Sequence, residues 1–213
     1  MSGNLHLELA RQASRLLFTV FNLDCRVKGR ENLPGPETAY ILAMNHASLL
    51  DPALIWAFHP HPVYFVAKEE FHRMPILGTA SARVGNIGVR RGQFDRTALE
   101  RSVEYLTVLG RVLGLFVEGT RTPDGELREP SSGPALLALM TGAPVVPAYL
   151  HGTVELLPRR AVVPRWRSDL QLVFGRPLQY PRAAEPPPAE QLRSVADEVG
   201  QALAALRRET VAA

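Results

Sequence analysis

Near the start of the chain, a histidine and an aspartate stand close enough together to act as a general base and its partner. His46 follows an apolar run at residues 40–43, and Asp51 lies five positions further on, directly before Pro52. Such a run is typical of a buried strand, so we expect His46 at a strand end. An aspartate before a proline that opens an apolar segment is typical of a helix N-cap.

The expected strand, turn and helix start can bring these two side chains together, whereas one continuous helix would place them about 140° apart around its axis. A neutral His46 could then donate one ring N–H to Asp51 while its second nitrogen takes a proton from a substrate hydroxyl. On this spacing alone, a loop histidine beside a simple helix cap is the alternative. The pair therefore needs support from other segments.

Two later segments also carry side chains suited to chemistry. At residues 85–92 a short strand flanked by glycines ends in two arginines, and at 116–125 a buried strand ends in Glu-Gly-Thr-Arg. Ligands of open α/β sheets bind at the carboxyl ends of strands, where we expect both segments. Glycine lets backbone approach a ligand, threonine offers a hydroxyl, and arginine offers a guanidinium fork for an oxyanion. The side chains concerned are Arg90, Arg91, Glu118, Gly119, Thr120 and Arg121. For Arg90 and Arg91 the alternative is a solvated strand end. For Glu118 and Arg121 it is a surface ion pair.

The elements that would position these residues alternate between strand and helix. Apolar runs predict strands at 38–44, 62–67, 86–89, 112–116, 144–150 and 170–174. Helical patterns lie between them, at 52–58, around 75–83, at 94–109 and at 134–141. This alternation predicts an α/β fold: a single layered domain with a mostly parallel or mixed β-sheet flanked by helices. We expect it to span residues 26–182.

Sequence patterns near both ends of the chain predict helices outside that domain. Within residues 1–25, the segment 4–22 predicts an amphipathic helix with an apolar stripe on one face and two arginines off it. Such a helix could lie in a bilayer interface or pack on the core. The stripe comprises Leu9, Ala13, Leu16, Leu17, Val20 and Phe21. A proline-rich linker at 183–189 precedes a predicted helix at 190–213.

Composition narrows the classes of partner and cofactor. The single cysteine, Cys25, excludes an internal disulfide and a cysteine-cluster metal site. The net charge of +3 is the balance of 24 basic and 21 acidic residues. Only two of the basic residues are lysine, and no long basic run suggests nucleic acid. A mild attraction to anionic membrane surfaces fits this charge better.

Membrane spans and export signals are not expected. Acidic Glu8 and the lack of a small-residue cleavage site argue against a secretory signal. Residues 130–154 carry no formal charge, but Pro134, Gly142, Pro144 and Pro147 divide them into a short helix and a strand. We expect a cytoplasmic protein that is peripheral or monotopic on the inner face of the cell membrane.

Taken in order, the segments resemble the glycerolipid acyltransferase family, which includes 1-acylglycerol-3-phosphate (lysophosphatidate) acyltransferases. Residues 45–51 resemble the family's Asn-His-x-x-x-x-Asp block, and 85–91 its second block, which ends in arginine. Residues 116–122 are similar to its Phe-Pro-Glu-Gly-Thr-Arg-Ser block, and 143–148 to its Val-Pro-Val-Val-Pro-Val block. Lys68 also falls where the family usually has a lysine. The chain departs at Gly88, Val117 and Ser132, where the family commonly has an aromatic, a proline and a lysine.

This resemblance implies acyl transfer from a thioester, on coenzyme A or acyl carrier protein, to the free hydroxyl of a lysophospholipid, with no cofactor and no metal. His46 would be the general base and Asp51 its orienter, with direct attack by the acceptor. No Gly-x-Ser-x-Gly elbow or activated-cysteine motif is present to form an acyl-enzyme, which agrees with direct attack. Arg91, Arg121 and Lys68 would hold the acceptor phosphate. The implied substrate-binding residues are Asn45, Lys68, Arg91, Glu118, Gly119, Thr120 and Arg121.

Three other functions remain open at this stage. The acceptor could be another lysolipid, an amino-acid lipid or a glycolipid, because the departures from the family pattern affect acceptor choice. The chain could instead bind lipid at a membrane surface without turnover. A metal hydrolase is the weakest alternative, because one histidine and one aspartate lack partners at metal-ligand spacing.

Overall fold

The computed structural model describes residues 5–72, 77–90, 94–122, 124–157, 165, 169–183 and 186–211. These residues form one sheet of seven strands in the order β1-β7-β6-β2-β5-β3-β4. The strands are β1 (Cys25–Lys28), β2 (Tyr40–Met44), β3 (Val63–Lys68), β4 (Ile87–Val89), β5 (Val112–Phe116), β6 (Val145–His151) and β7 (Leu170–Phe174). The predicted mixed sheet is therefore confirmed.

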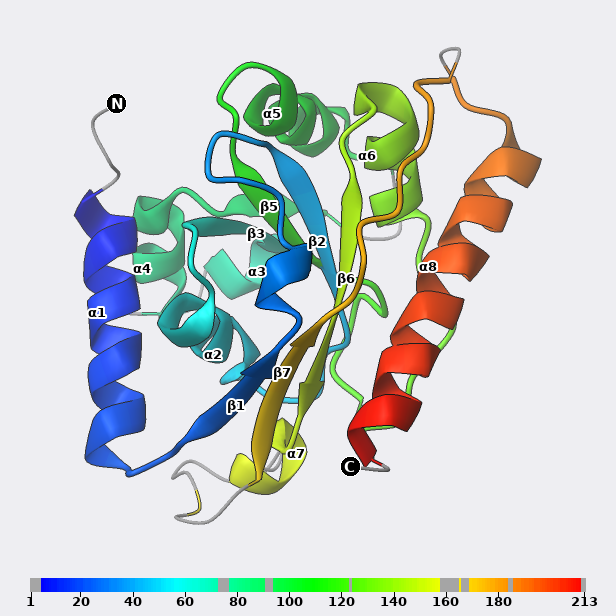
Figure 1. Cartoon of the computed structure of the whole chain (residues 1–213). Helices are drawn as coiled ribbons and strands as arrows, with labels where there is room; N and C mark the ends of the chain where they lie inside the picture. Colours follow the sequence, from blue (N-terminus) through cyan, green and yellow to red (C-terminus); the bar gives the residue numbers. More distant parts are fainter. Residues whose placement is uncertain are drawn as a thin grey trace.

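Strand directions gather the carboxyl ends of the central strands at one edge. β2 runs parallel to β5 and β6, and β3 runs parallel to β4 and β5. β7 is antiparallel to β6, and β1 is parallel to β7. In Figure 1 this common edge is the lower one, where β6 leads into the short helix α7 (Thr153–Leu156). The segments that follow β2, β3, β4, β5 and β6 therefore all emerge on the same side.

Strand β1 was missing from the predicted strands. It has four residues, and only Cys25 and Val27 are apolar, while Arg26 and Lys28 are exposed. It lies at the border of the sheet, where charged side chains help to protect an open strand edge from pairing with other chains. A strand this short and this charged lacks the apolar run by which the other strands were predicted.

Helices cover both faces of the sheet (Figure 1). The first half contains α1 (Leu5–Val20), the 3-10 turn η1 (Arg30–Asn32), α2 (Asp51–Phe58), α3 (Glu69–His72) and α4 (Leu77–Val84). The second half contains α5 (Arg96–Thr107), α6 (Gly133–Thr141), α7 and α8 (Ala189–Val211). The helices predicted at 52–58, 75–83, 94–109, 134–141 and 190–213 are thus present, with bounds shifted by a few residues. The short helices α3 and α7 were not predicted.

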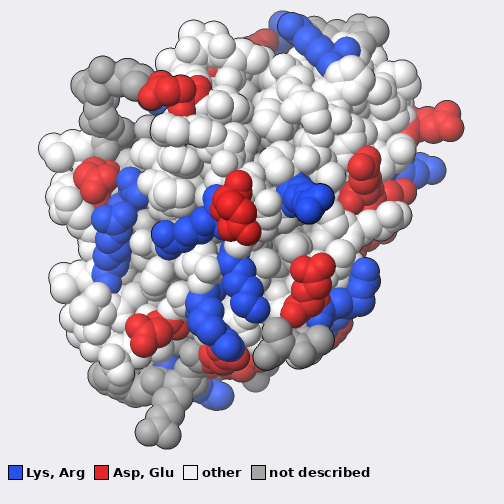
Figure 2. All heavy atoms as spheres, in the orientation of Figure 1, with Lys and Arg blue, Asp and Glu red and all other residues white. Residues whose placement is uncertain are grey.

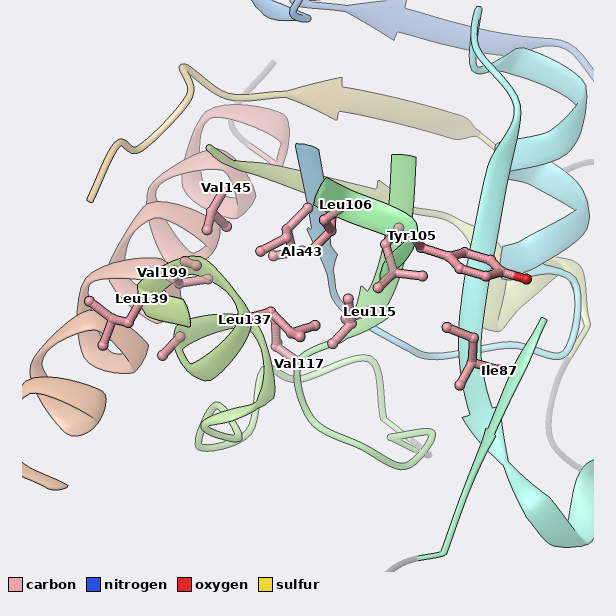
Figure 3. Packing of buried hydrophobic residues seen from close by; sticks show 14 of the residues in the cluster. Ala43, Ile87, Tyr105, Leu106, Leu115, Val117, Leu137, Leu139, Val145 and Val199 are labelled. Atoms are coloured by element: carbon pink, nitrogen blue, oxygen red, sulfur yellow. The ribbon is translucent and has the colours of Figure 1, made fainter. Parts of the chain in front are cut away.

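Alternate residues of β2 face two different cores. Tyr40, Leu42 and Met44 pack in a cluster with residues of α1 and α2. Ile41 and Ala43 point the other way, into a cluster formed with α5, α6 and α8. Figure 3 shows this second cluster, in which Ala43 and its neighbours on the sheet meet side chains of α6 and α8. A strand buried on both faces reads as a continuous apolar run, which is why β2 was predictable.

Helix α1 has a core-facing side and a separate exposed apolar side. Leu7 and Phe18 are each 2% exposed, so the helix packs on the molecule. Leu9, Leu16 and Val20 of the predicted stripe are 52%, 63% and 60% exposed. These three side chains therefore point away from the core, whereas Leu17 and Phe21 of the same stripe are half-buried and Phe21 packs against the core. None of the helices in the described ranges combines the length and apolar composition needed to span a bilayer.

Candidate active site

His46 and Asp51 meet at the carboxyl end of β2. The Nδ1 atom of His46 lies 2.7 Å from Oδ2 of Asp51, across the turn that joins β2 to α2. The Asp51 side chain is fully buried, whereas 18% of the His46 side chain is exposed. The contact expected from strand, turn and helix start is therefore present. It leaves Nε2 as the ring nitrogen that can face a substrate.

The predicted capping role of Asp51 is wrong. The N-cap of α2 is Leu50, without a side-chain hydrogen bond, and Asp51 is the first helical residue. Its Oδ2 instead accepts the backbone N–H groups of Ala47 and Ser48, each at 2.8 Å. Asp51 thus closes the turn that carries His46, in addition to contacting the imidazole. Pro52 does stand at the start of the helix, as predicted.

Asn45 joins the end of β2 to the neighbouring strand β6. Its Nδ2 donates to the carbonyl of Leu150 at 3.0 Å, and its Oδ1 accepts the Leu150 N–H at 2.8 Å. The residue is only 3% exposed. Both ends of the side-chain amide are thus occupied by backbone, and Asn45 ties the residue directly before His46 to β6.

The segment after β5 wraps around the backbone of His46. The Thr122 N–H donates to the His46 carbonyl at 2.8 Å, and the Val117 N–H donates to the Met44 carbonyl at 2.8 Å. Gly119 has a φ of 65°, a left-handed conformation in which glycine is favoured. The predicted residues 118–121 thus lie in the loop between these two hydrogen bonds. Of these, Thr120 is exposed and Arg121 is half-buried.

Glu118 is a second carboxylate close to Asp51. Both of its carboxylate oxygens are buried and, among the described residues, make no hydrogen bond of normal geometry. Burial raises its pKa from 4.5 to about 7, and the charge of Asp51 acts in the same direction. The backbone N–H groups of Arg128 and His46 favour the charged form, but the effect of burial on the pKa is larger. The site thus holds a carboxyl that titrates near neutral pH.

The Phe116 ring covers one face of the His46 imidazole. The ring centroids are 3.9 Å apart and the ring planes are inclined by 18°. The sequence prediction missed this residue, because it did not place β5 next to β2. The register of the two strands pairs Met44 with Phe116, which brings the aromatic side chain next to the turn after β2.

Cationic side chains lie on the β3 and β4 side of the same edge. Lys68 is the exposed last residue of β3. Arg90 follows β4, is exposed, and lies 3.6 Å from carboxylate oxygens of both Glu69 and Asp95. Arg90 thus lies at an exposed strand end and forms ion pairs within the chain. Arg91 lies outside the described residues.

On the other side of β2, a cavity of about 200 Å³ opens beside the His46 turn. Asn45 and Ala47 line it from the turn after β2, and Tyr149 and Thr153 line it from β6 and the start of α7. The Thr153 hydroxyl oxygen is buried and makes no hydrogen bond within the described part of the chain. Space and an available polar group are thus present on the side of His46 opposite the cations.

Comparison with known proteins agrees with this geometry. A chloroplastic 1-acyl-sn-glycerol-3-phosphate acyltransferase of Brassica napus is 29% identical over 175 residues, which cover 80% of this chain and 49% of that protein. An enzyme of the same name from Saccharomyces cerevisiae is 28% identical over 95% of this chain and 63% of its own length. The crystal structure of the 1-acyl-sn-glycerophosphate (LPA) acyltransferase PlsC from Thermotoga maritima has a TM-score of 0.71 and 29% identity, covering 94% of this chain and 79% of that one.

The chain spans about half the length of the first curated relatives that it matches. The sequence model of the Acyltransferase family matches residues 24–151, which include β1 to β6 and the whole His46 turn. That match covers more than half of the chain. The chain therefore belongs to the Acyltransferase family.

Proposed function

We propose that this protein transfers a fatty acyl group from a thioester, on coenzyme A or acyl carrier protein, to the free hydroxyl of lysophosphatidate. The observation that carries the proposal is the contact between His46 and the buried Asp51 at the carboxyl edge of the sheet. The names of the relatives support lysophosphatidate as the acceptor. The overall reaction forms a phospholipid precursor and releases a thiol.

In the proposed reaction, His46 Nε2 takes the proton from the acceptor hydroxyl while Nδ1 remains bonded to Asp51. The hydroxyl oxygen attacks the thioester carbonyl carbon and forms a tetrahedral oxyanion. Collapse of this intermediate breaks the carbon–sulfur bond, and the leaving thiolate takes the proton from the imidazolium. The products are the ester and the free thiol, and His46 is neutral again. Asp51 holds the His46 imidazole in the tautomer that carries a proton on Nδ1, and it stabilises the positive charge of the imidazolium.

The acceptor phosphate is proposed to bind on the β3 and β4 side of His46. Lys68, Arg91 and Arg121 would supply the positive charge, and an arginine fork suits a phosphate in bidentate fashion. Glu118 would position the acceptor, with Gly119 and Thr120 shaping the approach. The thioester would then reach the acceptor from the cavity on the β6 side. This division lets both substrates meet at one base.

We further infer that α1 rests on the inner face of the cell membrane. Its exposed apolar side chains lie on one side of the helix, as in helices that lie in a bilayer interface. Figure 2 shows mostly uncharged residues along the left border of the molecule, where α1 lies, with both acidic and basic side chains beside them. Apolar contact with acyl chains and attraction to anionic headgroups would act together.

The acceptor class is tested with a panel of lipids and one acyl thioester, by reading thiol release. Lysophosphatidate should accelerate release strongly, and unphosphorylated monoacylglycerol should be a poor acceptor. Arg121→Lys keeps the charge but loses the fork, so the KM for lysophosphatidate should rise while the thioester KM stays constant. Equal use of monoacylglycerol would point to a different lipid acceptor, and thiol release without any lipid dependence would contradict acyl transfer. Loss of activity with chelators would point to a metal hydrolase.

A further inference from the structure

The aromatic ring stacked on His46 belongs to a longer series of aromatic side chains. Behind Phe116, the ring of Phe65 lies parallel to it, with centroids 5.7 Å apart and planes inclined by 3°. Trp56 contacts Phe65 edge-on at 5.5 Å. Phe65 is 2% exposed, so Phe116 is backed by the core of the molecule. Phe116 is thus held against the imidazole and is not free to turn away.

The geometry of the His46 contact is unusual for two neutral rings. Neutral aromatic pairs prefer offset or edge-to-face contacts with centroids roughly 4.5–7 Å apart, because their negative faces repel each other. Here the centroids are only 3.9 Å apart and the planes nearly parallel. A cation over a ring face, in contrast, is attracted by that negative face. The arrangement therefore suits an imidazolium better than a neutral imidazole.

We propose that Phe116 stabilises the imidazolium that His46 becomes when it takes the proton of the acceptor hydroxyl. The inference rests on the proposed function, in which that cation forms during acyl transfer. Phe116 acts through His46 and is a positioning residue rather than a catalytic one. Its ring covers a face of the imidazole that would otherwise be hydrated, and it compensates for the lost water with its own negative face.

Besides the uncharged Phe116 ring, three charged groups influence the His46 site. Asp51 of α2 accepts from Nδ1 and favours the cation through its charge. Glu118, in the segment after β5, lies near enough for its carboxyl to feel the Asp51 charge, and Arg128 offsets part of that effect. Substitution of Phe116 leaves all three groups in place. Any change in the protonation of His46 would therefore report on the ring itself.

The test compares Phe116→Leu with Phe116→Tyr, because leucine fills the space without a π face and tyrosine retains one. Protonation of the His46 ring is followed by NMR titration, with the signal assigned by its loss in His46→Ala. In Phe116→Leu the titration midpoint should move to lower pH by roughly 0.5 or more. The acidic limb of the activity profile should move with it, and kcat should fall on the order of fivefold at unchanged acceptor KM. Phe116→Tyr should keep the titration midpoint, the acidic limb and kcat close to those of the parent protein.

The matched control is Phe65→Leu, which makes the same chemical change one ring further from His46. Phe65→Leu should leave the titration midpoint of His46 as it is in the parent protein. Thermal unfolding shows whether each variant is folded. A midpoint in folded Phe116→Leu that is unchanged or moves to higher pH would overturn the proposal. The NMR titration needs no turnover, so a parent protein without lysophosphatidate-dependent thiol release would refute the proposed function separately.

Discussion

Asn45 and Leu150 are joined by two hydrogen bonds, 3.0 and 2.8 Å long, in which the side-chain amide of Asn45 takes the place of a strand backbone. This bridge continues the pairing of β2 with β6 beyond Met44, whose partner is Ala148. It therefore reaches the residue directly before His46. The turn that carries His46 is anchored to the sheet on its β6 side by a side chain rather than by the backbone.

The first prediction concerns this bridge. Asn45→Ala leaves two buried backbone groups of Leu150 without partners, which should lower the free energy of unfolding by about 2 kcal/mol. It should also lower kcat, because His46 loses its support, while the KM of both substrates changes little. Chemical denaturation and steady-state kinetics measure the two effects. A raised acceptor KM with unchanged stability would mean instead that Asn45 contacts the substrate.

The second prediction separates the two roles of Asp51. Asp51→Asn can still accept the Ala47 and Ser48 amides but carries no charge to support the imidazolium, so kcat should fall by ~100-fold or more at nearly unchanged stability. Asp51→Ala removes the acceptor for both amides and should also lower the free energy of unfolding by about 2 kcal/mol. Equal stability loss in both variants would argue against the turn-closing role.

The third prediction concerns the pH dependence of stability through Glu118. Its pKa is raised by burial to about 7, so between 4.5 and about 7 the folded state binds more protons than the unfolded state. The stability that comes from this group is present at low pH and is lost as the pH rises through about 7. The Tm of the parent protein should therefore decrease from pH 5 to pH 8 relative to the Tm of Glu118→Gln, which has no carboxyl at this position to ionise. Parallel curves for the two proteins would show that Glu118 does not titrate there.

The fourth prediction tests membrane contact by α1. Leu9→Ser and Leu16→Ser alter exposed side chains, so thermal unfolding should change little while sedimentation with anionic vesicles should weaken. Val108→Ser is the matched control, because Val108 is 73% exposed but lies outside α1. Point variants are preferable to deletion of the helix, since Leu7 and Phe18 belong to the core. Unchanged vesicle binding in both α1 variants would favour a helix that only packs on the core.

Much of the sheet could be predicted from sequence because its central strands are buried on both faces. The contact of His46 with Asp51 was predictable as well, since it forms within one turn. What escaped prediction depends on which strands are neighbours. β5 inserts between β2 and β3, which follow each other along the chain, and only this order brings Phe116 to His46. Similarly, the partner of Asn45 is 105 residues away, and no local pattern marks it.

The measurement that tests the account most directly is the turnover of His46→Ala with an acyl thioester and lysophosphatidate. Asp51 keeps its two backbone donors in this variant, so the turn should persist and thermal unfolding should be nearly unchanged. We expect kcat to fall by ~100-fold or more, the usual weight of a general base. A folded His46→Ala protein that transfers the acyl group at the parent rate would contradict the central claim that His46 activates the acceptor hydroxyl.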